Sequence, residues 1–353
     1  MEKKHILIAV AAIMLVSCHS ATLSFDEVEY ITSSMTMPVR DVQTVDLGIK
    51  GIIDMKIRGP YMIVATSDNS GYIKVFDAES RTLLGSFFAQ GNGPGELILP
   101  VTVSSMSFAN TDGRWLASFN DNIGSFVRFD IGESVKQQKT VSQKYGSIPN
   151  GTFQALDLEN DKYFFKTMSA NRNAQKRYLV EHGREVIPPS FEILNKAELT
   201  PPPIDDGSYF NALSSIVRFE PEKAWFYEAS TELNTIHVYS EDGSFAKTFC
   251  MGDKLMDYNS VVKTEYKDRK RTFVSVDLFP EFYLALYQDS TIYDIDTGIA
   301  HDPEVLYLNI EEGVIGTIHL PFSATSIALD QSSGVLYAVN QMTEEVYACM
   351  VAE

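Results

Sequence analysis

Residues 86–100 read SFFAQGNGPGELILP, and this stretch decides the fold that the sequence predicts. Pro94 fixes its own φ at about −65°, whereas Gly91, Gly93 and Gly95 can adopt the positive φ that a sharp chain reversal requires. Apolar residues that suit β-strands flank the reversal on both sides. The stretch therefore predicts a tight corner between two four-stranded units, as found between the blades of a β-propeller.

The rest of the chain repeats this plan. An aromatic residue opens an apolar strand in each of six units, and these residues are Tyr61, Trp115, Tyr163, Trp225, Tyr283 and Tyr337. Successive members are 54, 48, 62, 58 and 54 residues apart. A short strand precedes each aromatic, and a third and a fourth strand follow most of them, with turn residues such as Glu241-Asp242-Gly243 between these two. Six units of four antiparallel strands predict an all-β, six-bladed β-propeller in which the repeated aromatics pack between blades.

The last unit lacks a fourth strand, because the chain ends soon after a third strand near 344–350. Residues 42–47 (VQTVDL) have strand composition but belong to no unit. We expect them to form the outer strand of the last blade, which closes the ring and covers an open edge. The propeller is then predicted to span residues 41–353. Helical periodicity is nearly absent, and the only helix candidate is residues 253–270.

The N-terminus has the form of an export signal. Lys3 and Lys4 precede an apolar run of eleven residues, Ile6–Val16, which is too short to span the roughly 30 Å of a bilayer core. Leu15-Val16-Ser17-Cys18 resembles the lipobox of bacterial lipoproteins, in which the peptide is cut before the cysteine and the cysteine is acylated. An ordinary secretory signal with an incidental cysteine is the alternative.

The lipobox resemblance implies a signal peptide over residues 1–17, lipidation of Cys18 and a tether over 18–40 that is partly docked on the fold. The residues after the cysteine, His19-Ser-Ala-Thr-Leu23, lack the acidic cluster that resembles a surface-export signal. We therefore expect an outer-membrane protein that faces the periplasm, with surface exposure as the alternative.

The charge of the chain restricts its partners. The net charge is −18 and the pI is about 4.7, which argues against nucleic acid or an anionic membrane surface as a partner. The one basic run, residues 263–271 (KTEYKDRKR), is expected to be a solvated face. Cys250 and Cys349 fall in the fourth and sixth units, which are not neighbours, so both are expected to be buried free thiols.

A family resemblance rests on the corner Gly91-Asn-Gly-Pro-Gly-Glu96 and the following Pro100. This pattern resembles the Gly-x-Gly-Pro-Gly-Glu signature of the NHL-like or TolB-like six-bladed propeller lipoproteins common in Bacteroidota. Leu97 stands where that family usually has an aromatic residue. The resemblance extends loosely from about residue 40 to the end, and it implies the fold and an envelope location but little chemistry.

No catalytic constellation is present in the sequence. The Gly-x-Ser-x-Gly elbow of α/β hydrolases is missing. The glycine-rich corner is not a phosphate loop, because a strand follows it and Pro94 lacks an N–H donor. Asp157-Leu-Glu-Asn-Asp161 matches a calcium loop only in part and is expected to be a solvated turn. The histidines His182, His237, His301 and His319 show no metal-ligand spacing. We therefore predict no catalytic residue, no metal site and no cofactor.

Geometry nevertheless indicates where a ligand would bind. In a propeller, the loops between second and third strands and the corners between blades open on one face, around the central channel. Ten polar residues are expected there: Asp68, Asn69, Glu96, Asn120, Asp121, Arg172, Glu228, Gln288, Asp289 and Gln341. Their mixed charge suits a small ligand or a peptide.

The sequence thus predicts a lipid-anchored propeller that acts as a binding or scaffold module for a ligand or an envelope protein. Two alternatives remain open at this point. One is a metal-dependent propeller enzyme of the lyase or lactonase type, and the other is a glycan-binding accessory lipoprotein. Fold alone cannot decide between them, because propellers carry many functions.

Overall fold

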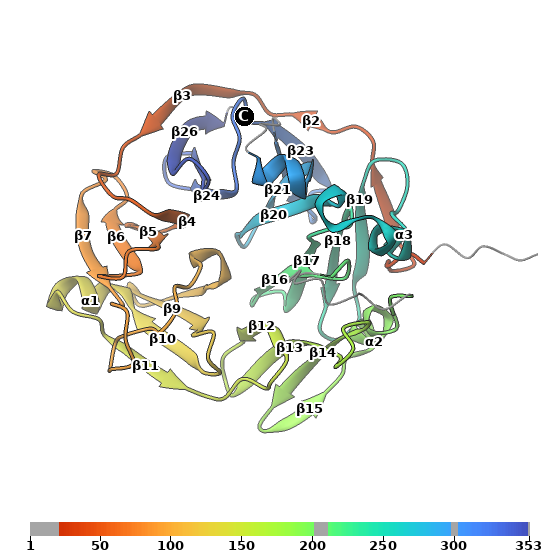
Figure 1. Ribbon diagram of the computed structural model, residues 1–353, viewed down its shortest axis with the longest axis horizontal. Helices are drawn as coiled ribbons and strands as arrows, with labels where there is room; N and C mark the ends of the chain where they lie inside the picture. The colour runs from red at the N-terminus through yellow and green to blue at the C-terminus, as the bar shows by residue number, and fades with distance from the viewer. Residues whose placement is uncertain (1–20, 201–210, 298–302, 352–353) are drawn as a thin grey trace, which may run out of the picture.

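The computed structural model describes residues 21–200, 211–297 and 303–351. Six β-sheets stand as blades around a common axis, with the first strand of each sheet nearest the centre of the ring (Figure 1). The predicted all-β, six-bladed propeller is confirmed. The predicted signal peptide, residues 1–17, and Cys18 lie outside the described residues. No described helix is long and apolar enough to cross a membrane.

Each blade contains four antiparallel strands. From the centre of the ring outward, blades 1 to 3 are formed by β4 (Ile52–Arg58), β5 (Tyr61–Thr66), β6 (Ile73–Asp77) and β7 (Leu83–Phe87); by β8 (Ser107–Thr111), β9 (Arg114–Asn120), β10 (Phe126–Asp130) and β11 (Ser142–Tyr145); and by β12 (Thr152–Asp157), β13 (Lys162–Met168), β14 (Gln175–Glu181) and β15 (Arg184–Val186). In the same order, blades 4 to 6 are formed by β16 (Ser215–Glu220), β17 (Trp225–Ser230), β18 (Thr235–Ser240) and β19 (Ala246–Met251); by β20 (Lys270–Leu278), β21 (Tyr283–Thr291), β22 (Glu304–Asn309) and β23 (Val314–His319); and by β24 (Ser326–Asp330), β25 (Val335–Asn340), β26 (Glu345–Val351) and β3 (Val39–Val45).

The ring closes through blade 6. Strand β3 pairs antiparallel with β26, so that Val45 lies opposite Val346 and Gln43 lies opposite Ala348. The predicted closure by residues 42–47 is confirmed, with the strand at 39–45. N-terminal and C-terminal segments of the chain therefore contribute to one sheet, and β3 covers the edge that β26 would otherwise expose.

Residues 21–45, which we call the N-terminal strap, lie along the outer edges of blades 4, 5 and 6 (Figure 1). Strand β1 (Val28–Ile31) pairs parallel with β19, and β2 (Met35–Thr36) pairs parallel with β23. The strap is also anchored by apolar contacts, since Leu23 and Phe25 are buried in the core between blades 3 and 4. The docking expected for part of residues 18–40 is therefore extensive, and it begins as early as residue 21.

Aromatic side chains fill the wedges between blades, as predicted. Tyr163 of blade 3 stacks on Phe126 of blade 2, with ring centroids 5.3 Å apart. Tyr283 of blade 5 stacks on Tyr227 of blade 4 at 4.9 Å. Large flat rings suit these contacts, because the gap between two blades widens away from the axis.

The glycine-rich corner connects blade 1 to blade 2, but its glycines have different roles. Only Gly95 adopts a positive φ, of 77°. A Cβ at Gly91 would lie 2.0 Å from Oε2 of Glu96, so a larger residue there would require the Glu96 side chain to move. That carboxylate folds back over the corner and accepts a hydrogen bond from the N–H of Gly93 at 2.7 Å. The Glu96 side chain therefore stabilises the chain reversal through a hydrogen bond inside the corner.

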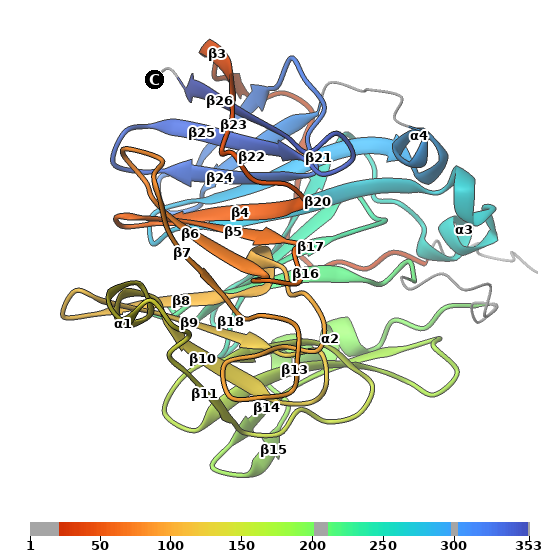
Figure 2. The same cartoon turned by 60° about the vertical axis from the view of Figure 1, so that its left-hand side comes forward.

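Helices are confined to short connections. The predicted helix over 253–270 is present as α3 (Tyr258–Lys263) and a 3-10 turn, η2 (Tyr266–Asp268). The expectation of no other helix was wrong, because three more are described: α1 (Ile131–Gln137), α2 (Pro189–Asn195) and α4 (Ile292–Asp296). Each is seven residues or fewer, too short for a 3.6-residue apolar period to show in the sequence. Figure 2 shows that α3 and α4 project from the same side of the ring.

The two cysteines of the described chain are confirmed as buried and free. Cys250 lies in blade 4 and Cys349 in blade 6. Burial raises the pKa of both thiols to about 11, so neither is reactive near neutral pH.

Candidate functional site

The ten polar residues predicted to surround the central channel are here called the rim residues. Most of them lie where the second strands of the blades end. Asp68, Asn69, Asp121, Arg172 and Gln341 are in turns between second and third strands, and Asn120 is the last residue of β9. Glu96 is in the corner between blades 1 and 2. Gln288 and Asp289 lie inside β21, near its end, because that strand is longer than predicted.

Several of these residues hold their own turns. Asp68 forms an ion pair with Lys74 at 2.7 Å and also binds Ser70. Asp121 is buried, accepts hydrogen bonds from two N–H groups of its turn and pairs with Lys144 at 3.2 Å. These carboxylates are committed to the fold, which explains their presence without a ligand.

The remaining rim residues make similar local contacts. Asn120 accepts a hydrogen bond from the N–H of Asn122, and the carbonyl of Asn69 accepts one from Gln90. The carbonyl of Arg172 accepts a hydrogen bond from Asn211, and Asp289 pairs with Lys270 at 2.8 Å. Whether any of them binds a ligand stays a prediction.

The placement of Glu228 on the rim was wrong. Strand β17 continues to Ser230, so Glu228 is two residues inside the strand and only 1% exposed. It lies at the interface of blades 3 and 4, where it meets two cations.

Gln288 and Gln341 are brought together in a cleft between blades 5 and 6. The cleft has a volume of about 290 Å³. Its lining comes from η2, β20, β21, α4 and the turns of blade 6: Tyr266, Arg271, Val274, Gln288, Ile292, Ile295, Thr325 and Gln341. The structure thus selects two of the ten predicted residues and adds six that sequence analysis did not identify. We call this the blade 5–6 cleft.

Hydrogen bonds fix the polar side of this cleft. Gln288 donates through Nε2 to the carbonyl of Ala324 at 2.5 Å, which orients its amide. The hydroxyl of Thr325 donates to the carbonyl of Val339 and accepts from the N–H of Gln341 at 3.0 Å. The first of these bonds crosses from blade 5 to blade 6 and joins the two walls of the cleft, whereas the two bonds of Thr325 lie within blade 6.

Arg271 forms the charged end of the cleft. Its guanidinium donates to Oε1 of Glu232 at 2.8 Å and to the hydroxyl of Tyr266 at 3.1 Å. Glu232 is fully buried and also lies 3.7 Å from Arg269. The prediction that residues 263–271 form a solvated face was therefore wrong for these two arginines, which turn inward toward a buried carboxylate.

Apolar side chains form the rest of the lining of the blade 5–6 cleft. Ile292 and Ile295 come from α4, which a reciprocal capping box between Thr291 and Asp294 begins. The lining of the cleft therefore combines amide and hydroxyl groups with branched apolar side chains. This is the usual composition of a small-molecule site, and its volume is near the lower end of the range for such sites, about 300–1,000 Å³.

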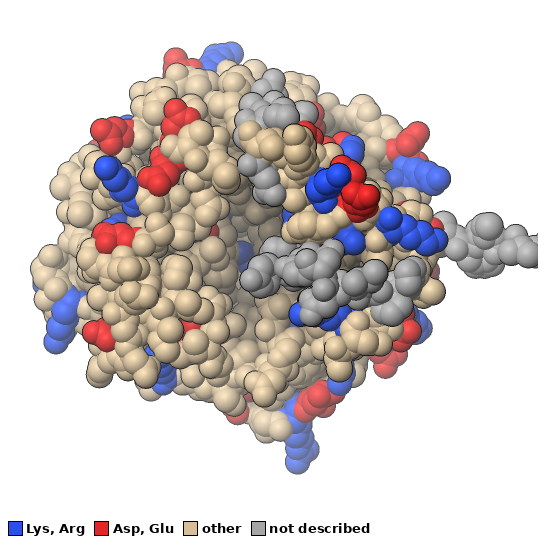
Figure 3. All heavy atoms as spheres, viewed as in Figure 1, with Lys and Arg blue, Asp and Glu red and all other residues tan. Residues whose placement is uncertain are grey.

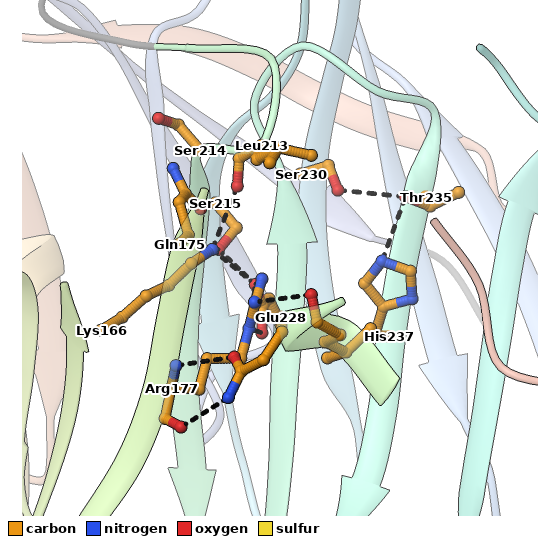
Figure 4. A network of polar contacts seen from close by, with 12 residues as sticks. Lys166, Gln175, Arg177, Leu213, Ser214, Ser215, Glu228, Ser230, Thr235 and His237 are labelled. Atoms are coloured by element: carbon orange, nitrogen blue, oxygen red, sulfur yellow. Dashed lines mark hydrogen bonds and ion pairs between the residues drawn. The ribbon is translucent and has the colours of Figure 1, made fainter. Parts of the chain in front are cut away.

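A second polar constellation is fully buried between blades 3 and 4, where Lys166, Arg177 and Ser215 converge on Glu228 (Figure 4). Oε1 of Glu228 lies 2.6 Å from Nζ of Lys166 and 2.5 Å from Arg177. Oε2 accepts from the hydroxyl of Tyr239 at 2.9 Å. One carboxylate therefore joins four side chains from two blades.

The electrostatics of this cluster follow from its burial. Burial and the neighbouring charge of Arg177 lower the pKa of Lys166 and Glu228 opposes both, with the result that this pKa is about 7. Burial alone would raise the pKa of Glu228, but the charges of Arg177 and Lys166 outweigh it and hold that pKa well below its ordinary value. With side chains 0–1% exposed, these groups clamp two blades together and have no path to a substrate.

His237 lies beside this clamp on β18 and is completely buried. Its ring nitrogens face the hydroxyls of Thr235 and Thr248, at 3.4 and 3.1 Å. Burial lowers the pKa of His237 to about 4, so the ring is neutral at physiological pH.

The described residues contain no group of three or more His, Cys, Asp or Glu side chains that could hold a metal ion. Asp157, at the edge of the partial calcium motif, instead pairs with Arg128 at 3.1 Å and accepts a hydrogen bond from the hydroxyl of Tyr145. His301 lies outside the described residues. The geometry described thus supports recognition in the blade 5–6 cleft and assigns no residue to covalent chemistry.

Two solved structures from Bacteroides have a similar fold. A protein of Bacteroides fragilis NCTC 9343 that is described as exported is 10% identical, and the match covers 92% of this chain and 99% of that one with a TM-score of 0.51. A member of the DUF4221 family from Bacteroides vulgatus ATCC 8482 is 13% identical, with coverage of 93% and 94% and a TM-score of 0.51. At these identities the likeness shows the fold alone. No protein-family model matches the sequence, and no curated protein matches it.

The clamp gives a test of stability. We expect Glu228→Gln to lower the free energy of unfolding by about 3–5 kcal/mol, because it leaves two buried cations without their carboxylate. The control is Glu185→Gln, which removes the partner of Lys176 in an exposed pair 2.5 Å apart and is expected to cost less than about 1 kcal/mol. Urea denaturation measures both. Similar losses for the two variants would show that Glu228 is no clamp.

His237 gives a test of pH dependence. Its pKa is about 4 in the folded protein and about 6.5 in the unfolded chain, so the unfolded chain binds more protons between these values. The free energy of unfolding should therefore fall by about 3 kcal/mol on account of this residue as the pH drops from about 6.5 to 4. Denaturation series at several pH values should show a shallower decline for His237→Asn. An unchanged slope in that variant would contradict the assignment.

Proposed function

We propose that this protein is a lipid-anchored module of the bacterial cell envelope that binds a small ligand or a short peptide in the blade 5–6 cleft. The observation that carries the proposal is the cleft itself, whose lining combines two amides, a hydroxyl and an arginine with apolar side chains. Its polar groups are held in place by hydrogen bonds, of which the one from Gln288 to Ala324 joins blades 5 and 6, so little ordering is needed when a ligand binds.

The chemistry of the cleft restricts the ligand. Amide and hydroxyl groups donate and accept hydrogen bonds without charge, which suits peptide groups, acetamido groups or sugar hydroxyls. Ile292 and Ile295 favour a ligand with an apolar part. Arg271 is already paired with Glu232, so an anionic group is not required for a good fit.

The envelope location is supported by the N-terminal sequence and by the fold neighbours. The apolar run Ile6–Val16 and the Leu-Val-Ser-Cys18 motif have the form of a lipoprotein signal. One of the two similar Bacteroides structures is described as an exported protein. We place the protein on the periplasmic side of the outer membrane, held by acyl chains on Cys18, which gain ~0.8 kcal/mol per buried CH₂.

Two neighbouring positions test the cleft. Gln341 lines it, whereas Met342 is 60% exposed in the same turn and does not. We expect the full-length protein to bind members of either a glycan array or a short-peptide array. Gln341→Trp, which fills the cleft, should weaken this binding by about tenfold or more, while Met342→Trp should leave it intact. Binding that survives Gln341→Trp, or no binding on either array, would refute the cleft as the site.

Metabolic labelling tests the anchor. Cells given a tagged palmitate should label the wild-type protein, which should sediment with membranes. Cys18→Ser should abolish the label, because Cys250 and Cys349 are buried and cannot be acylated in the folded protein. Equal labelling of the two forms, or no label on the wild type, would contradict the proposal.

A further inference from the structure

Five charged side chains meet at the axis of the ring. Asp54, Lys56 and Arg58 come from β4 of blade 1, Arg218 from β16 of blade 4, and Asp277 from β20 of blade 5. Each is buried or nearly so, with Arg58 the most exposed at 15% of its side chain. We call this group the axial cluster; it contains three cations and two carboxylates.

Lys56 shows that the cluster spans the ring. Its Nζ donates to the carbonyls of Val276 in blade 5 and Ile327 in blade 6, both at 2.7 Å. A side chain of blade 1 therefore reaches across the centre to two other inner strands. All three of its donors are directed at these carbonyls or at Asp277, 3.7 Å away, so Lys56 is committed to the fold.

The two carboxylates are committed as well. Oδ1 of Asp277 accepts from Arg58 at 2.5 Å, and Oδ2 accepts from the N–H of Leu329 at 3.2 Å. Asp54 accepts from two N–H groups at the start of the 3-10 turn η1 (Val103–Ser105), at 2.9 and 2.7 Å. All four carboxylate oxygens of Asp54 and Asp277 thus have hydrogen-bond partners other than Arg218.

Arg58 is also fixed. Its guanidinium lies between the rings of Phe108 and Phe279, at 5.2 and 5.0 Å from their centroids, and pairs with Asp277. It therefore cannot move to serve another group without losing two cation–π contacts and an ion pair.

Arg218 is the exception. It is 8% exposed, and among the described residues its one hydrogen bond goes to the carbonyl of Val217 at 2.6 Å. A guanidinium has five N–H donors, so most of those of Arg218 have no acceptor among the described residues. The hydroxyl of Tyr283 is buried and has no hydrogen-bond partner among the described residues. Strand pairing places Arg218 opposite Tyr227, and the ring of Tyr227 stacks on that of Tyr283 with centroids 4.9 Å apart, so Arg218 and Tyr283 both lie beside Tyr227. Burial raises the pKa of Tyr283, and the charge of Arg218 acts to lower it, as expected for neighbouring groups.

The net charge of the axial cluster also favours the binding of an anion. With three cations and two carboxylates, the cluster has one positive charge in excess, and a buried net charge is costly. Burial lowers the pKa of Lys56 to about 8 and also lowers the pKa of Arg218. A ligand with one negative charge and several acceptor oxygens would neutralise the excess positive charge and would also provide acceptors for the N–H groups of Arg218.

We propose that the axial cluster is an anion-binding site that takes a carboxylate or phosphate group, with Arg218 and the hydroxyl of Tyr283 as its donors. Arginine matches the paired oxygens of both groups, and a hydrogen bond to a charged acceptor is stronger than one to a neutral acceptor. The face drawn in Figure 3 is hollowed at the centre of the ring. This site is separate from the blade 5–6 cleft and does not depend on the function proposed for it.

Calorimetric titration of the full-length protein with sodium phosphate and with sodium acetate, at constant ionic strength in chloride, tests the proposal. We expect saturable binding of at least one of the two anions at one site. Binding of acetate without phosphate identifies a carboxylate as the ligand group, and the converse identifies a phosphate; either result supports the site.

Three variants decide whether the axial cluster is responsible. Arg218→Met should weaken anion binding by about tenfold or more, and Tyr283→Phe by about threefold to tenfold, because each removes a donor to a charged group. Tyr283→Phe deletes a hydroxyl that has no partner among the described residues, so it should fold normally even if Arg218→Met does not. Arg184→Met, at an exposed position in β15, is the matched control and should bind as the wild type does.

The proposal is overturned if neither anion binds the wild type saturably. It is also overturned if Tyr283→Phe and Arg184→Met bind as tightly as the wild type, since binding would then occur elsewhere on the surface.

Discussion

Pairing of β3 with β26 is the contact on which the rest of the ring depends. The two strands are about 300 residues apart in the chain, so their pairing must overcome a large loop-closure entropy before it stabilises anything. Once made, it brings the inner strands of blades 1, 5 and 6 close enough for Lys56 to bind carbonyls of two other blades. The axial cluster is therefore a product of closure, and no single blade could form it.

Two buried charge clusters occupy this interior, and they differ in completeness. Between blades 3 and 4, Glu228 has both of its oxygens engaged by two cations and two hydroxyls, so the cluster is internally satisfied. At the axis, both carboxylates are engaged, and Arg218 is left with a single backbone acceptor among the described residues. Since buried polar groups in folded proteins nearly always have partners, the first cluster fits a structural role and the second fits a role in recognition.

The fold could be predicted because the sequence contains two clear signals, a repeated aromatic position and an incomplete last repeat. An aromatic residue recurs at the start of each second strand, and the last unit lacks a strand that only residues 42–47 could supply. The site was less accessible. Glu228 was misplaced because nothing in the sequence marks where β17 ends, and one or two extra strand residues turn a loop position into a core position. The cleft depends on Arg271 turning toward Glu232, 39 residues earlier in the chain, and a basic run alone does not reveal this partner.

Because the strap is docked from residue 21 onward, only a short length of chain would separate a lipid on Cys18 from the folded ring. Ala21 is fixed to the first turn of α3, because its N–H donates to Asp257 at 3.1 Å and its carbonyl accepts from Tyr258 at 2.9 Å. Ala21 is the third residue after Cys18, which gives a reach of roughly 10 Å even when fully extended. A lipid on Cys18 would therefore hold the protein close to a membrane through the segment next to α3, with only a short length of chain over which it could swing.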